Sequence, residues 1–123
     1  MAANDFPSAI ENITYALDVL IPLNGENSAN CMHTLNRKAA ILYMAGRYKE
    51  AKPIAQKSVL GYAEHFGEEH PLIVKMYSLL GDCCYALGEQ DEATNAYGKA
   101  LNIAEKLYAP GANQIIEIKA KLN

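Results

Sequence analysis

Apolar residues recur every three or four positions along most of the chain, in six segments separated by short polar breaks. This spacing is the period of an α-helix with one buried face. No strand-like alternation and no hairpin signal competes with it. The pattern predicts an all-α fold of about six helices. They are expected over Phe6 to Pro22, Ala29 to Ala45, Tyr48 to Gly67, Pro71 to Leu87, Gln90 to Tyr108 and Asn113 to Asn123.

The breaks contain residues that end helices. Pro22 and the polar stretch 24–28 are expected to end the first helix, with Gly25 as its left-handed cap. Gly46 and Gly88 are expected to end the second and fourth helices. The remaining breaks are equally short, so consecutive helices should pack as antiparallel hairpins.

The chain also repeats itself. Residues 46–51 and 88–93 each have a glycine, three polar residues and then Glu-Ala, and Ala51 and Ala93 are 42 residues apart. A fixed period of this size indicates stacked supersecondary units, and hence a short solenoid. At 123 residues the chain is expected to form one domain, 1–123. Its predicted units are a partial unit 6–28, full units 29–70 and 71–112, and a terminal helix 113–123.

Small residues recur where two helices of a unit would have to approach each other. A large side chain at these positions would hold the helix axes further apart than the usual 8 to 10 Å. This requirement predicts close helix packing in both full units. The residues are Ala39 and Gly81 on the earlier helices, and Ala51, Ser58, Ala93 and Ala100 on the later ones.

These residues resemble the tetratricopeptide repeat family. The second full unit matches the family pattern at Tyr77, Leu80, Gly81, Gly88, Ala93, Tyr97 and Ala100, and the first at Leu35, Ala39, Gly46, Tyr48, Ala51 and Ser58. The offset of 42 and the linker at 66–71 resemble the longer repeat of kinesin light chains. Similar repeats occur in the C-terminal region of SET- and MYND-domain lysine methyltransferases. The resemblance implies a right-handed solenoid.

The same resemblance implies a concave groove lined by the first helix of each pair. Arginine can hold a carboxylate with two parallel hydrogen bonds, and tyrosine offers an apolar ring with a polar tip. Carried over by position, the candidate peptide-binding residues are His33, Asn36, Arg37, Ala40 and Tyr43 in one unit and Lys75, Ser78, Leu79, Asp82 and Tyr85 in the next.

Two functions follow. The preferred one is a non-catalytic interaction scaffold that binds a peptide segment of a partner protein in this groove. The alternative is a structural, oligomerisation or docking region of a larger protein, such as the C-terminal helical region of a SET/MYND-type methyltransferase. Under the alternative, the apolar terminal faces formed by Ile13 with Leu17 and by Ile115 with Ile118 would matter more than the groove.

Composition and charge exclude other classes of partner. The net charge of −3, with basic residues mixed among acidic ones, does not suit a nucleic-acid binder. No apolar run reaches the roughly 18 to 20 residues needed to cross a bilayer, so no membrane partner is expected. The first residues lack a secretory signal, which favours a cytoplasmic location.

No residue set predicts catalysis, a metal or a cofactor. Cys31 and His33, with His65 and His70, lack the closely spaced second pair of ligands that zinc requires. Cys83 and Cys84 fall on a core stripe and are expected to be small buried hydrophobes. His70 precedes Pro71 in an interhelical turn. The run 49–52 is expected to be a solvated helix face.

The terminal helices lack the partners that the repeat would give them. The first aligns with the second member of a pair and the last with a first member, and a solenoid needs capped ends. Three arrangements would meet this need: the chain is a piece of a longer array, its terminal helices act as caps, or apolar terminal faces meet in an oligomer. A piece of a longer array or a homodimer is preferred over a free monomer. On the last helix, Ile115, Ile118 and Leu122 should face inward, and Glu117, Lys119 and Lys121 outward.

Overall fold

The computed structural model describes residues 6–24 and 29–122, and every regular element in these ranges is an α-helix. The all-α prediction is confirmed. The helix bounds agree with the predicted ones to within two residues. The helices are α1 (Phe6–Asn24), α2 (Ala29–Met44), α3 (Tyr48–Phe66), α4 (Pro71–Ala86), α5 (Gln90–Leu107) and α6 (Asn113–Leu122).

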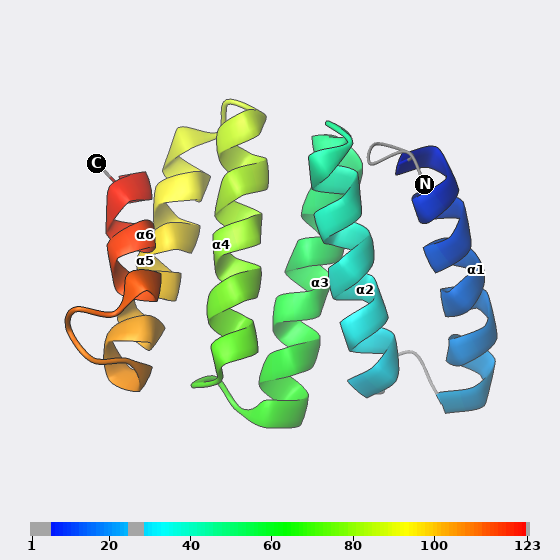
Figure 1. Ribbon diagram of the computed structural model, residues 1–123, viewed down its shortest axis with the longest axis horizontal. Coiled ribbons are helices and arrows are strands. Elements are labelled where there is room, and N and C mark those ends of the chain that lie inside the picture. The colour runs from blue at the N-terminus through cyan, green and yellow to red at the C-terminus, as the bar shows by residue number, and fades with distance from the viewer. Residues whose placement is uncertain (1–5, 25–28, 123) are drawn as a thin grey trace.

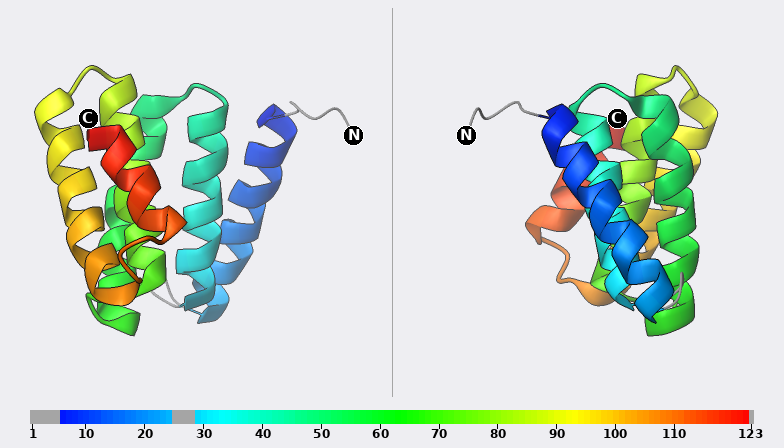
Figure 2. Two further views of the ribbon diagram at one scale, coloured as in Figure 1. Left: turned by 60° about the vertical axis from the view of Figure 1, so that its left-hand side comes forward. Right: turned by 90° about the vertical axis from the view of Figure 1, so that its right-hand side faces the viewer.

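The helices pack in sequence order, each against the next (Figure 1). Equivalent helices begin 42 residues apart, at 29, 71 and 113 for α2, α4 and α6, and at 48 and 90 for α3 and α5. Figure 1 shows α2 in front of α3 and α6 in front of α5, and the right-hand view of Figure 2 shows α3 and α5 together on the side opposite α6. The helices thus form two layers, as stacked hairpins require. The division into units 29–70 and 71–112 stays a prediction.

The two glycine turns have the same geometry. Gly46 and Gly88 have φ of 80° and 81°, a left-handed conformation that glycine adopts without a steric cost. In each turn the glycine N–H donates to the carbonyl three residues earlier, and the N–H of the next residue donates to the carbonyl five residues earlier. In the first turn these bonds join Gly46 to Tyr43 at 3.0 Å and Arg47 to Leu42 at 2.9 Å. In the second turn they join Gly88 to Tyr85 at 3.0 Å and Glu89 to Cys84 at 2.9 Å. This pair of bonds is the Schellman motif, so the turn prediction is confirmed.

Pro22 alone does not end the first helix. α1 continues to Asn24, the first residue of the polar stretch that was expected to end it together with Pro22, so Pro22 lies inside the last turn. Proline removes one backbone hydrogen bond, that to the carbonyl of Asp18. Because Asp18 and Pro22 are both exposed, we expect that carbonyl to reach water, which makes the lost bond tolerable here. The predicted cap Gly25 lies outside the described residues.

The small residues bring the helices together as predicted. Ala39, Ala51, Ser58 and Ala100 have no exposed surface and Ala93 has 2%. Gly81 faces the ring of Tyr97 across the α4–α5 contact. Two large clusters share the core, one over α1 to α4 and one over α4 to α6.

The residues of the terminal apolar faces are buried, and Ile115 and Ile118 face inward as predicted. Ile13 and Leu17 are 7% and 5% exposed, and Ile115 and Ile118 are 2% and 3% exposed. Leu17 belongs to the core cluster over α1 to α4, and Ile115 and Ile118 belong to the cluster over α4 to α6, so helices of the stack cover them. Among the α1 side chains that the structure describes, the large apolar ones that are exposed are Tyr15, Val19, Ile21 and Leu23.

Candidate functional site

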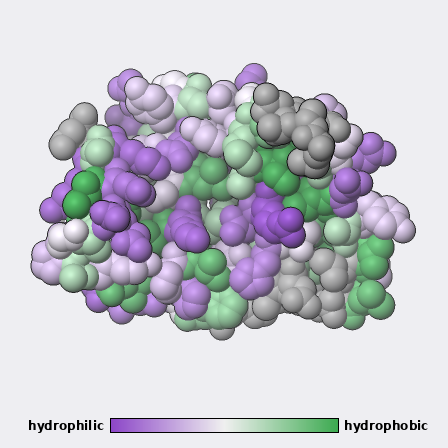
Figure 3. All heavy atoms as spheres, in the orientation of Figure 1, coloured by the Kyte–Doolittle hydropathy of each residue, from purple (hydrophilic) through white to green (hydrophobic). Residues whose placement is uncertain are grey.

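The face formed by α2, α4 and α6 carries the predicted groove residues. Figure 3 shows this side of the molecule, where hydrophilic residues alternate with smaller hydrophobic areas. None of the predicted residues is fully buried. His33, Arg37, Lys75 and Tyr85 are exposed, whereas Asn36, Ala40, Tyr43, Ser78, Leu79 and Asp82 are half-buried.

At one end of α2, His33 is engaged with α3. Its Nδ1 lies 3.1 Å from the hydroxyl of buried Tyr62, and its ring is 6.2 Å from that of Phe66. Burial raises the pKa of Tyr62, and a hydrogen bond with Asn36 partly offsets this. Phe66 stacks on His70 at 4.8 Å. The histidine ring of His33 therefore belongs to an aromatic cluster that joins α2 to α3.

His70 has a structural role, as its place before Pro71 suggested. Its Nδ1 accepts a hydrogen bond from the backbone N–H of Leu72 at 3.1 Å, which caps the start of α4. A ring nitrogen used in this way is not available to a metal ion.

The two groove tyrosines differ. Tyr43 packs against Tyr48 with ring centroids 5.4 Å apart, and its pKa is raised by burial and then by the charge of Asp82. Tyr85 is 64% exposed. Tyr43 is thus held between helices, whereas the Tyr85 ring is open to solvent.

A pocket of about 590 Å³ lies between α4, α5 and α6, and Asp82 and Tyr85 are among its lining residues. The Tyr97 hydroxyl donates to Asp82 Oδ1 at 2.5 Å. Lys121 Nζ lies 3.2 Å from each carboxylate oxygen of Asp82 and 5.6 Å from the centre of the Tyr97 ring. Burial, and then the hydrogen bond to Asp82 and its charge, raise the pKa of Tyr97.

Lys121 and Tyr97 were not among the predicted site residues. The sequence pattern predicts an outward-facing Lys121, and it gives Tyr97 as a match to the family pattern. The repeat itself contained the missing signal, since a 42-residue step from Arg37 leads to Leu79 and a second step leads to Lys121. The same steps from Asn36 lead to Ser78 and Ala120, and Ala120 also lines the pocket.

Arg37 and Lys75 are the cations of this face that remain available. Within residues 6–24 and 29–122, neither side chain forms an ion pair, and both are exposed. Arg37 lies on α2 and Lys75 on α4. Both charged groups are thus open to solvent.

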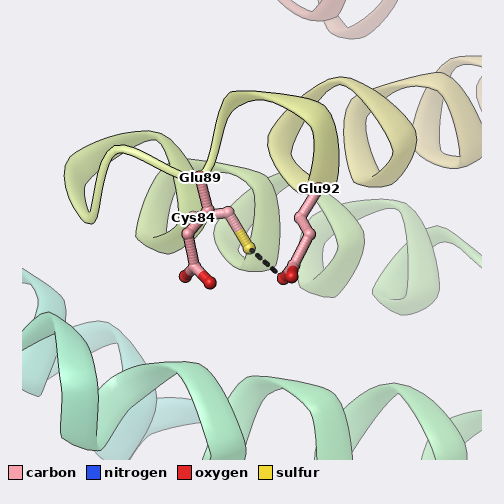
Figure 4. A group of neighbouring side chains, drawn as sticks. All are labelled: Cys84, Glu89 and Glu92. Carbon is pink, nitrogen blue, oxygen red and sulfur yellow. Dashed lines mark hydrogen bonds between the residues drawn. The ribbon is translucent and has the colours of Figure 1, made fainter.

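Cys84, Glu89 and Glu92 form the one group with metal-ligand chemistry in the described part of the chain. Figure 4 shows their side chains converging where α4 turns into α5, with the Cys84 thiol directed at Glu92, 3.8 Å away. Lys52 of α3 already supplies a cation here. Its Nζ lies 2.9 Å from both oxygens of Glu89 and 2.7 Å from Glu92.

This arrangement is an ion-pair network between two repeats. The hydrogen bonds that Lys52 donates to Glu92 and Glu89 raise the pKa of Lys52, whereas burial raises the pKa of the Cys84 thiol and disfavours the thiolate that a metal would need. Lys52, placed by the sequence on a solvated face, is half-buried. The geometry thus favours a structural role for the group.

Stacked helical hairpins with a repeated turn and a polar inner face define the class of helical-repeat proteins. The model of the tetratricopeptide repeat family matches residues 30–106, more than half of the chain, and the chain belongs to that family. Domains of this family generally mediate protein–protein interactions and are typically non-catalytic. The predicted resemblance is confirmed.

One solved structure extends this comparison. The chain is similar to the kinesin-light-chain-like protein BtubC (BKLC) from P. vanneervenii, with a TM-score of 0.87 over 95% of this chain and 19% sequence identity. The chain spans about half the length of BtubC, since it covers 47% of that protein. No curated protein matches it. No helix of the described residues is both long and apolar enough to cross a bilayer.

Proposed function

We propose that the face of α2, α4 and α6 binds an extended or helical segment of a partner protein. The observation that carries the proposal is the repetition of the groove positions. Steps of 42 residues place polar, charged and aromatic side chains on one face of successive helices, and none of them is buried in the core. Repeated, partly exposed positions on a rigid helical stack suit recognition of a segment that runs across the stack.

The side chains on this face favour a segment that carries both carboxylates and an apolar residue. Arg37 and Lys75 are exposed and have no internal acidic partner among the described residues. Tyr85 and half-buried Leu79 offer apolar surface nearby on α4. Arginine and tyrosine are frequent among the residues that dominate binding energy at interfaces.

Selection of peptides from a random display library on the immobilised protein tests the proposal. The selected peptides would then be titrated against a groove variant, Arg37→Ala with Tyr85→Ala. The matched control is Lys49→Ala with Leu60→Ala on α3, which removes the same charge and a side chain that is 72% exposed, against 64% for Tyr85.

The groove variant should bind at least about tenfold more weakly, because interface hot spots cost 2 kcal/mol or more each. Helical circular dichroism should be unchanged, since the substituted side chains are exposed. The control variant should bind like the unmodified protein. Equal binding by all three proteins would refute the groove.

A further inference from the structure

The pocket between α4, α5 and α6 has the chemistry of a cation site. We call it the acid–aromatic pocket, formed by Asp82, Tyr85 and Tyr97. Its carboxylate is half-buried, with 22% of the side chain exposed. A partly desolvated carboxylate beside a tyrosine ring attracts an ammonium or guanidinium group both by charge and through the ring face.

The structure itself contains an occupant of this kind. The ammonium of Lys121 lies equally far, 3.2 Å, from the two carboxylate oxygens of Asp82, and it also lies over the Tyr97 ring. Tyr97 orients the carboxylate through its hydroxyl, 2.5 Å from Oδ1. The pocket is therefore built to hold a basic side chain, and Lys121 shows how such a side chain would sit.

The hold on Lys121 is weak. Charge-assisted N–H to oxygen bonds are usually about 2.7 to 2.9 Å long, and those of Lys52 in the same protein fall in that range, whereas those of Lys121 measure 3.2 Å. The Lys121 side chain is also 39% exposed. Exposed ion pairs contribute little to stability, so a competing cation can displace this one.

We propose that the acid–aromatic pocket recognises a lysine or arginine side chain of the partner segment, and that Lys121 is an internal occupant which that side chain displaces. The inference rests on the proposed function, because it assigns a basic residue to one end of the bound segment. Arg37 and Lys75 would face the acidic part of the segment. The two chemistries together would fix the direction in which the segment lies.

Short peptides test the pocket apart from the rest of the groove. Acetylated and amidated Ala-Ala-Lys-Ala-Ala would be titrated into the labelled protein and followed by the backbone NMR signals of the pocket. Arginine, norleucine and glutamate replace the lysine in three further peptides. The protein variants are Lys121→Ala, Asp82→Asn, and Lys119→Ala as a control that removes the same charge from the same helix.

The lysine and arginine peptides should shift the signals of the pocket, and the norleucine and glutamate peptides should not. Lys121→Ala should bind the basic peptides roughly three- to tenfold more tightly, because the internal competitor is gone. Lys119→Ala should bind like the unmodified protein. Asp82→Asn should lose binding, although its amide oxygen can still accept the Tyr97 hydroxyl.

Absence of any shift at the pocket would overturn the inference, as would equal binding by Lys121→Ala and Lys119→Ala, or undiminished binding by Asp82→Asn. A folded spectrum of each variant is the condition for the comparison, and exposed Lys121 can be removed without touching the core. If the basic peptides fail while groove-selected peptides still need Arg37, the inference is wrong and the proposed function stands. If the basic peptides bind at the pocket while the groove variant binds its selected peptides like the unmodified protein, the pocket recognises basic side chains but the proposed binding of a segment across the face is wrong.

Discussion

Gly81 lies where α4 and α5 approach each other, and adding one methyl group there should measurably destabilise the protein. A Cβ at residue 81 would lie 2.5 and 2.6 Å from Cε1 and Cδ1 of Tyr97, whereas ordinary contacts are 3.4 to 4 Å. The Tyr97 ring has little room to move, because it is 4% exposed and its hydroxyl is bonded to Asp82. The helices must therefore separate, or the ring must leave its position.

The size of the effect follows from two opposing contributions. Overpacking a well-filled core typically costs about 1 to 3 kcal/mol. Alanine in place of glycine inside a helix contributes about 0.8 to 1 kcal/mol of stability. Because the contacts are under 3 Å and the ring cannot move away, the cost here lies in the upper part of that range, at about 2 to 3 kcal/mol. Gly81→Ala should therefore lower the free energy of unfolding by about 1 to 2 kcal/mol, which for a slope of about 1.5 kcal/mol/M moves the urea midpoint down by roughly 0.7 to 1.3 M.

Urea unfolding followed by circular dichroism measures this, with Gly98→Ala as the matched control. Gly98 is inside α5, and a Cβ there would meet no atom within 4 Å. The same substitution should raise stability there by about 0.5 to 1 kcal/mol. If Gly81→Ala is as stable as the unmodified protein, or if both variants shift in the same direction, the close approach of Gly81 and Tyr97 is refuted.

Three further predictions concern titratable groups. Lys52→Met should destabilise the protein more at low than at high salt, because it leaves the carboxylates of Glu89 and Glu92 facing each other, and a salt-independent loss would contradict this. Burial raises the pKa of the Cys83 thiol to about 11, so this fully buried group should react with a thiol reagent near neutral pH only after unfolding, and rapid labelling of the native protein would argue against it. Because the pKa of Tyr97 is raised, its hydroxyl keeps its proton to a higher pH in the folded state than in the unfolded state. Stability should therefore fall above about pH 10, less steeply in Tyr97→Phe, in unfolding titrations across that range.

The sequence predicted the helices well because their signals are local. A period of apolar residues, a glycine such as Gly46 and a Glu-Ala pair all act within one or two turns of the chain. The effect of Pro22 is less local, because whether a proline ends a helix depends on whether the freed carbonyl can find another partner.

The parts of the site that were missed depend on contacts distant in sequence. Lys52 meets Glu89 and Glu92 across 37 and 40 residues, and Lys121 meets Asp82 across 39. No short pattern predicts which lysine of a charged helix face will turn toward a neighbouring repeat. The groove assignment of residues such as Arg37 and Tyr85 stays a prediction, because the fold places them on one face but does not show a partner.

The helix pairs α2–α3 and α4–α5 pack closely through different pairs of residues, and this gives the Gly81 prediction a second test. Forty-two residues before Gly81 and Tyr97 stand Ala39 and Ala55, both without exposed surface. Where α5 carries the ring of Tyr97, α4 has a glycine, which has no Cβ. Where α3 carries the methyl group of Ala55, α2 has an alanine, Ala39, which has one. In a Tyr97→Leu background, which lacks the ring atoms that a Cβ at residue 81 would meet, Gly81→Ala should therefore stabilise instead of destabilise, with a coupling energy of about 2 to 3 kcal/mol between the two sites. The same sign in both backgrounds would mean that glycine is needed at residue 81 for its backbone and not for the ring it faces.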